Sequence, residues 1–289
     1  MATLKIENLN KVYPNGVKAL DNVSIEISNG MFGLLGPNGA GKSSLMRTLA
    51  TLQEADSGTA FLNDIDILNN PLELRKVLGY LPQEFGVYPK ITAEQLLDHI
   101  AILKGITNNK ERKELVNYLL QKVNLYEQRS KSVKGFSGGM KQRVGIAQAL
   151  IGNPQLIIVD EPTAGLDPGE RNRFHNLLAD VGQDVVIILS THIVDDVREL
   201  CSNMAIMNLG QLVYQGSPNN VLQELKGKVW QKSIERTQVA EYQKNYQVIS
   251  DKMVAGNPLI HVLSESNPGD GFEQVEPNLE DVFFTKINN

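Results

Sequence analysis

The sequence has little cysteine and no long apolar segment. Cys201 is the single cysteine among 289 residues, so neither an intrachain disulfide nor a cysteine-based metal cluster can form, and a reducing cytosol is compatible. Apolar runs such as Val185–Leu189 are far shorter than the roughly 20 residues that cross a bilayer. The first residues, Met1–Ile6, lack the basic and apolar regions of a signal peptide. Work at a membrane would therefore require a partner that holds the chain there.

Basic charge is also scarce. The formal net charge is −5, the isoelectric point is near 5.5, and no run rich in lysine or arginine stands out. This balance argues against a surface that binds DNA or RNA, and we expect no nucleic-acid partner. The chain is long enough for one large domain, or for a domain of ordinary size followed by a smaller one.

What the sequence does contain is a glycine-rich stretch, Gly36–Ser44, directly after the apolar run Met31–Leu35 and directly before Leu45–Ala50. This order predicts a strand, a loop and a helix. Successive backbone N–H groups of such a loop surround an anion, and the helix adds its positive N-terminal end, so polyphosphate is the natural ligand. A chance glycine-rich turn is the alternative, and the flanking strand and helix disfavour it.

The residue types in this phosphate loop suit a polyphosphate. Glycines at 36, 39 and 41 permit backbone angles and a close approach that a Cβ would block. Lys42 offers a point charge to the β- and γ-phosphates, and Ser43 offers a hydroxyl to Mg²⁺. The residues expected to bind the ligand are Gly36, Asn38, Gly39, Ala40, Gly41, Lys42, Ser43 and Ser44.

A pair of acids, Asp160 and Glu161, follows the apolar run Leu156–Val159, a pattern typical of a buried parallel strand. Parallel strands present their carboxyl ends to one sheet edge, so the acids should meet the phosphate loop. Asp160 is expected to hold Mg²⁺ or its water shell, and Glu161 to orient and deprotonate an attacking water. Gln83 follows another strand and is a neutral ligand candidate for Mg²⁺ or water. His192 follows the last such strand, where it could be a structural histidine or could reach the γ-phosphate.

A second glycine-rich loop, Gly135–Met140, opens the helix Lys141–Leu150. It is either a tight turn for packing or a second phosphate site that caps a nucleotide bound to another subunit. Tyr13 lies beside the turn Pro14–Gly16 and, taken alone, is best interpreted as a half-buried strand tyrosine.

The remaining pattern predicts an α/β chain with additions. Residues 3–27 alternate like antiparallel strands, and residues 84–150 form a mostly helical insertion with a capping box at Thr92 and Gln95. The amphipathic faces of that insertion could be plain core or a docking surface for a partner helix. We expect a boundary after residue 217, with residues 218–289 forming a small α+β domain that ends in a helix from Leu279.

Six motifs resemble, in content and order, those of the nucleotide-binding subunit of an ATP-binding cassette (ABC) transporter. They are Gly36–Ser43, Gln83, Phe136–Met140, Ile157–Glu161, Ala164–Asp167 and His192. The resemblance implies a P-loop ATPase core in residues 1–217 and two copies that face head to tail. ATP and Mg²⁺ would lie between the Lys42 loop of one copy and four residues of the other copy, Ser137, Gly138, Gly139 and Asp167. It also implies that Tyr13 stacks on adenine.

The resemblance further implies a role for the chain. The catalytic residues would be Glu161, His192, Gln83 and Lys42, and the Mg²⁺ ligands would be Ser43, Gln83 and Asp160. Gln83 would link the nucleotide to the helical insertion, which in the family docks onto a membrane subunit. Met140 departs from the glutamine that the family most often has.

We therefore expect an ATPase subunit, homodimeric, held at the cytoplasmic face of the cell membrane by a separate permease that it powers. The tail Leu279–Phe283 is similar to the C-terminal signature of exporter-type subunits that handle drugs, lipids or polysaccharides. One alternative is a soluble cassette ATPase of translation or chromosome maintenance. The other is a regulatory nucleotide-binding module with little hydrolysis.

Overall fold

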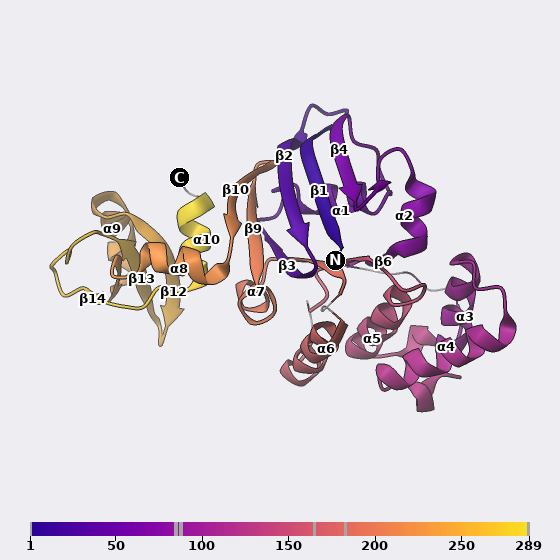
Figure 1. The fold of residues 1–289 in the computed structure, drawn as a ribbon. Coiled ribbons are helices and arrows are strands. Elements are labelled where there is room, and N and C mark those ends of the chain that lie inside the picture. The colour runs from indigo at the N-terminus through magenta and orange to yellow at the C-terminus, as the bar shows by residue number, and fades with distance from the viewer. Residues whose placement is uncertain (1, 84–85, 87–88, 164–165, 182–183, 288–289) are drawn as a thin grey trace.

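The computed structural model describes the whole chain except residues 1, 84–85, 87–88, 164–165, 182–183 and 288–289. Its centre is a six-stranded sheet in the order β10-β9-β3-β8-β7-β6, parallel except for the antiparallel pair of β9 and β10 (Figure 1). The strands are β3 (Gly30–Leu35), β6 (Leu78–Leu81), β7 (Leu156–Asp160), β8 (Val186–Thr191), β9 (Asn203–Asn208) and β10 (Gln211–Gly216).

The unbroken apolar runs predicted to be buried parallel strands are confirmed, because every residue of β7 and β8 is buried. Their pairing register sets Asp160 beside Ser190, and the register of β3 on β8 sets Leu35 beside Thr191. The carboxyl ends of the three strands therefore meet at one edge of the sheet. The loops that follow them emerge together there.

The N-terminal strands form a second, antiparallel sheet in the order β2-β1-β4-β5, as the alternation predicted. Its strands are β1 (Thr3–Val12), β2 (Lys18–Ser28), β4 (Ser57–Leu62) and β5 (Ile65–Asp66). Helix α1 (Lys42–Leu49) buries Leu45, Met46 and Leu49 in one hydrophobic cluster with residues of both sheets. The helix that begins in the phosphate loop is therefore held on both sides. Helix α2 (Pro71–Val77) precedes β6.

The predicted helical insertion lies beyond the β6 edge of the central sheet (Figure 1). It contains α3 (Ala93–Leu103), α4 (Asn109–Lys122), two short 3₁₀ turns (Tyr126–Gln128 and Val133–Gly135) and α5 (Gly138–Ala149). The capping box is confirmed, since Thr92 Oγ1 accepts from Gln95 N and Gln95 Oε1 accepts from Thr92 N. Helix α5 approaches β6 so closely that a Cβ on Gly79 would lie 2.3 Å from the Ala149 carbonyl oxygen.

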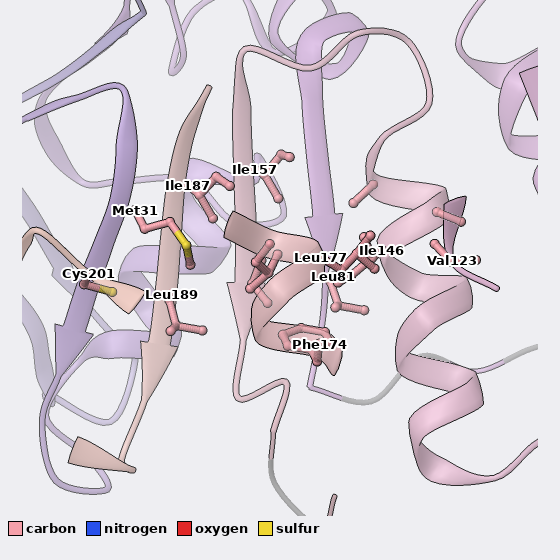
Figure 2. Packing of buried hydrophobic residues seen from close by; sticks show 14 of the residues in the cluster. Met31, Leu81, Val123, Ile146, Ile157, Phe174, Leu177, Ile187, Leu189 and Cys201 are labelled. Atoms are coloured by element: carbon pink, nitrogen blue, oxygen red, sulfur yellow. The ribbon is translucent and has the colours of Figure 1, made fainter. Parts of the chain in front are cut away.

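Helices α6 (Pro168–Val181) and α7 (Val194–Leu200) follow β7 and β8. Figure 2 shows Phe174 and Leu177 of α6 packed against Leu81 of β6 and Ile146 of α5. This cluster joins the central sheet to the insertion. Among the described residues, no helix has the length and apolar character needed to cross a bilayer.

Residues after 217 form a third sheet, in the order β12-β13-β11-β14, with its own small hydrophobic cluster around Trp230, Tyr242 and Phe272. The elements are α8 (Pro218–Leu225), β11 (Val229–Ser233), a 3₁₀ turn (Arg236–Gln238), α9 (Val239–Asn245), β12 (Val248–Val254), β13 (Asn257–Leu263), β14 (Glu273–Gln274) and α10 (Leu279–Ile287). Helix α10 lies between this sheet and strands β9 and β10 (Figure 1). Leu279 and Val282 of α10 belong to the same buried cluster as the central sheet. The architecture agrees with the expected α/β core and its three additions.

Candidate active site

A cavity of about 680 Å³ lies at the edge of the central sheet where β3, β7 and β8 end. It is lined by Tyr13, Val17, Ala19, residues 36–44, Gln83, Glu161, His192 and Phe283. The structure therefore brings the phosphate loop, the second acid of the acidic pair, the glutamine and the histidine to one place, although they are spread over more than half of the sequence.

The phosphate loop adopts backbone angles that its glycines permit. Gly39 and Gly41 have φ values of 82° and 107°, in the region that favours glycine. A Cβ on Gly41 would lie 2.3 Å from the Ala19 carbonyl oxygen, and one on Gly36 would lie 2.6 Å from that of Met207. The loop is therefore pressed against its neighbours on two sides, and larger residues would displace it.

Lys42 is 6% exposed and folds back over the loop that precedes it. Its Nζ donates to the carbonyl oxygens of Gly36 at 2.6 Å and Pro37 at 3.1 Å. Burial lowers the pKa of Lys42, and the nearby carboxylates of Glu161 and Asp160 oppose that shift. The ammonium thus lies inside the loop, where phosphate oxygens would replace the carbonyls as acceptors.

Asp160 is buried at the end of β7, with 8% of its surface exposed. Burial raises the pKa of Asp160, and the neighbouring carboxylate of Glu161 raises it further. A buried carboxylate whose charge is disfavoured is suited to a cation. Ser43 and Gln83 line the cavity, whereas Asp160 is not among its lining residues. A carboxylate, a hydroxyl and an amide oxygen are donors that Mg²⁺ prefers, and binding of Mg²⁺ by these three residues stays a prediction.

Glu161 adopts a backbone conformation that is uncommon for a residue with a side chain, with φ of 48°. Its N–H donates to the Ser190 carbonyl at 2.8 Å, which fixes the turn after β7 to the end of β8. Its Oε2 lies 2.8 Å from Nδ1 of His192. The Glu161 carboxylate is 13% exposed and the imidazole 55%. The strained turn thus aims the carboxylate at the cavity, and His192 orients it there.

Tyr13 lies beside the phosphate loop and is held by its hydroxyl. The hydroxyl is 3.0 Å from Ser44 Oγ and donates to Gln53 Oε1 at 3.0 Å. Tyr13 lines the cavity together with Val17, and its stacking on adenine stays a prediction. Gln53 was missed in the sequence because it follows α1 without any pattern of its own.

The second glycine-rich loop does not line this cavity. Ser137 and Gly138 are exposed at the start of α5, and Ser137 Oγ accepts from Met140 N at 3.3 Å. Asp167 Oδ1 accepts from Glu170 N at 2.9 Å at the start of α6. A Cβ on Gly139 would lie 2.5 Å from Oε2 of Glu170, so the two helix starts touch. Ala164 and Gly165 of the expected Ala164–Asp167 motif lie outside the described residues.

Fold and cavity together define a P-loop nucleotide-binding protein. Residues 20–164 match the family model described as "ABC transporter". The chain is 32% identical over 301 residues to the "Probable multidrug ABC transporter ATP-binding protein YbhF" of Escherichia coli (strain K12), with 98% of this chain and 51% of YbhF covered. It is 32% identical to the "Methionine import ATP-binding protein MetN" of Histophilus somni (strain 129Pt), with 81% of this chain and 70% of MetN covered.

Solved structures agree with these relatives. A dimeric post-hydrolysis state of the ATP-binding cassette MJ0796, bound to ADP and Pi, matches 74% of this chain and 98% of its own, with a TM-score of 0.68 and 25% identity. The chain therefore belongs to the ABC transporter family, whose ATP-binding cassettes are ATPases that hydrolyse ATP to power transport. It spans about half the length of YbhF.

Proposed function

We propose that this chain is the ATP-hydrolysing subunit that powers a separate membrane permease. The observation that carries the proposal is the contact of 2.8 Å between Glu161 Oε2 and His192 Nδ1, in the same cavity as the Lys42 loop. A carboxylate held by an imidazole, beside a loop built for phosphate, is suited to activate water rather than only to bind a nucleotide. This favours an ATPase over a regulatory module with little hydrolysis.

In the proposed reaction the triphosphate lies on the backbone N–H groups of the phosphate loop. The Lys42 ammonium donates to β- and γ-phosphate oxygens instead of to Gly36 and Pro37, and so neutralises charge that develops during transfer. Glu161 accepts a proton from the water molecule that is aligned with the γ-phosphate. His192 keeps Glu161 and the γ-phosphate in fixed positions relative to each other. Ser43, Gln83 and Asp160 would hold Mg²⁺, which supplies further charge neutralisation at the phosphates.

We infer that the site is completed by a second copy of the chain. Ser137, Gly138 and Asp167 are outside the cavity of their own chain, and the serine and first glycine are exposed at a helix start that suits a phosphate. The matching cassette structure is described as dimeric, which supports the formation of a dimer. Closure of two copies on ATP would then be the step that drives the permease.

The permease is proposed to dock where the helical insertion meets the core. Leu52 after α1, Leu72 on α2 and Leu103 on α3 are 60%, 70% and 70% exposed. Their elements adjoin, because Lys104 Nζ donates to the Arg75 carbonyl at 2.6 Å and Arg75 Nη2 donates to the Thr51 carbonyl at 3.1 Å. Exposed apolar side chains on adjoining elements fit a protein partner. Such docking would place the chain at the cytoplasmic face of the membrane.

We further propose export as the direction of transport and residues 218–289 as an accessory domain. The match to YbhF, whose printed name refers to multidrug transport, extends over 98% of this chain, whereas the match to MetN covers 81%. A drug, a lipid or a polysaccharide remains the proposed class of cargo.

The proposal is tested by phosphate release from Mg²⁺-ATP with the purified chain and two variants. Glu161→Gln is expected to keep ATP binding, to lose at least about 100-fold in hydrolysis and to elute as an ATP-dependent dimer in size-exclusion chromatography. Lys42→Ala is the matched control that should lose both binding and dimer. Hydrolysis by Glu161→Gln at the wild-type rate would refute the assignment of the base.

A further inference from the structure

One wall of the nucleotide cavity comes from the last helix of the chain. Phe283 of α10 lines the cavity together with the phosphate loop, Glu161 and His192. Among the described residues after 217 it is the one that does so. The ring is partly buried and packs at the border of the large hydrophobic cluster. An aromatic surface from the C-terminal residues is therefore continuous with the surface of the phosphate loop.

The start of α10 is fixed to the C-terminal sheet. Asn278 Oδ1 accepts from Asp281 N and Asp281 Oδ2 accepts from Asn278 N, each at 3.0 Å, which is a reciprocal capping box. Asp281 is fully buried, and its Oδ1 lies 2.7 Å from Nδ1 of His261 on β13 and accepts from Ser250 Oγ on β12 at 3.3 Å. Phe283 follows this anchor by two residues, so its position is tied to the third sheet.

The end of α10 is fixed to the phosphate loop through the turn between β9 and β10. Asn208 Nδ2 donates to the Ile287 carbonyl at 3.1 Å. Two residues beyond Asn208, Gly210 N donates to the Ala40 carbonyl at 2.9 Å. Helix α10 is therefore held at both ends, by the C-terminal sheet and by the turn that supports the phosphate loop.

We propose that Phe283 is a nucleotide-contacting residue, supplied in cis by the C-terminal residues, and that α10 thereby links residues 218–289 to nucleotide binding. The inference rests on the nucleotide site proposed above. An aromatic ring at the wall of a cavity contributes apolar contact and stacking surface at little cost in conformational freedom. Because α10 is anchored on both sides, a nucleotide that contacts Phe283 also stabilises the placement of the third sheet against the cassette.

The test is fluorescence titration of the full-length chain with a mant-labelled ADP in the presence of Mg²⁺. Phe283→Ala is expected to raise Kd roughly two- to tenfold, the range typical of losing one aromatic contact. Phe283→Leu keeps apolar bulk and should give a smaller rise. The matched control is Phe284→Ala, because Phe284 is the next residue on α10 but lines a different cavity, of about 290 Å³, beside β12. The ring of Phe284 packs edge-on against that of Phe283, with centroids 5.4 Å apart, so Phe284→Ala should raise Kd less than Phe283→Ala does.

The melting temperature of each variant without nucleotide shows whether a higher Kd comes from a lost contact with the nucleotide or from weaker packing of the folded chain. A contact role raises Kd more in Phe283→Ala than in Phe284→Ala, even where both variants melt at similar temperatures. Wild-type Kd in both Phe283 variants, or an equal rise of Kd in Phe284→Ala, would overturn the inference. If the wild-type protein bound no nucleotide, the proposed function itself would be overturned. If wild type and the Phe283 variants bind nucleotide equally well and Lys42→Ala does not, the proposed function stands and only the role of Phe283 is refuted.

Discussion

At the scale of single residues, the cavity and the end of β7 beside it contain features that cost stability before a ligand is considered. Asp160 and Lys42 are ionisable residues that are only 8% and 6% exposed. Burial raises the pKa of Asp160 and lowers that of Lys42, so it favours the neutral form of each. Glu161 adds a backbone angle that most residues avoid. A bound triphosphate with Mg²⁺ would compensate both buried charges. The arrangement is therefore better explained by binding than by folding.

A variant of Asp160 tests this explanation. Burial raises the pKa of Asp160 above its ordinary value of 3.8, so the ionised carboxylate destabilises the folded protein at neutral pH. Asp160→Asn removes the charge and keeps the shape. We expect its melting temperature without nucleotide at pH 7.5 to rise by about 1–3 °C. Phosphate release from Mg²⁺-ATP should fall in the same variant.

The difference in stability between Asp160→Asn and wild type should depend on pH in a defined direction. A carboxyl with a raised folded pKa contributes stability that is present at low pH and is lost as the pH rises through the folded pKa. The advantage of Asp160→Asn should therefore shrink when melting is repeated at progressively lower pH, because wild-type Asp160 becomes protonated once the pH falls below its raised pKa. A variant that melts below wild type at pH 7.5 would contradict the argument, since Lys42 would then already compensate the charge.

At the scale of elements, local sequence patterns predicted the strands and helix caps that depend on neighbouring residues. The apolar runs of β7 and β8 and the capping box at Thr92 lie in the structure where the sequence indicated them. Some contacts between distant residues left no such signal. The bond from Tyr13 to Gln53 spans 40 residues, and the pair of His261 with Asp281 spans 20. Such pairs depend on how sheets pack, which periodicity and turn residues do not encode.

The tail shows the same limit. From the sequence, Leu279–Phe283 could be described as an amphipathic closing helix or as a resemblance to exporters. The structure gives its residues separate physical tasks: Asp281 caps and anchors the helix, Leu279 and Val282 are buried in the large cluster, and Phe283 lines the cavity. In this short motif, both the folding of α10 and the lining of the cavity restrict which residues are tolerated.

The anchor of α10 predicts how much the helix depends on Asp281. Asp281→Ala removes the partner of the Asn278 N–H, of Ser250 and of His261, and leaves one buried and two partly buried polar groups without that partner. We expect a loss of about 2–4 kcal/mol in the free energy of unfolding, measured by urea denaturation. Asn278→Ala removes the cap alone and should cost about 1 kcal/mol. Equal losses in the two variants would show that the contacts of Asp281 with His261 and Ser250 contribute nothing.

At the scale of the whole molecule, the two halves of the proposed ATP site lie on different parts of one chain. The Lys42 loop lines the cavity at the edge of the central sheet, whereas Ser137 is exposed on the helical insertion. The packing of α5 on β6 and α6 makes the insertion part of the same body, so Ser137 cannot fold over onto its own cavity without breaking that core. The proposed site, with Ser137 as one of its residues, would therefore be formed by two chains, with two sites in each symmetric dimer.

This arrangement predicts that two inactive variants restore each other. In a dimer of Lys42→Ala with Ser137→Ala, one site carries both changes, and the other combines an intact Lys42 loop with an intact Ser137. Each mixed dimer has one intact site. An equal mixture should therefore recover about a quarter of wild-type phosphate release where the chains pair at random, and up to about half where Lys42→Ala pairs with Ser137→Ala but not with itself. Each variant alone should stay near background. A mixture no more active than the average of the two variants would mean that each chain hydrolyses ATP without residues from the other, and the shared site would have to be abandoned.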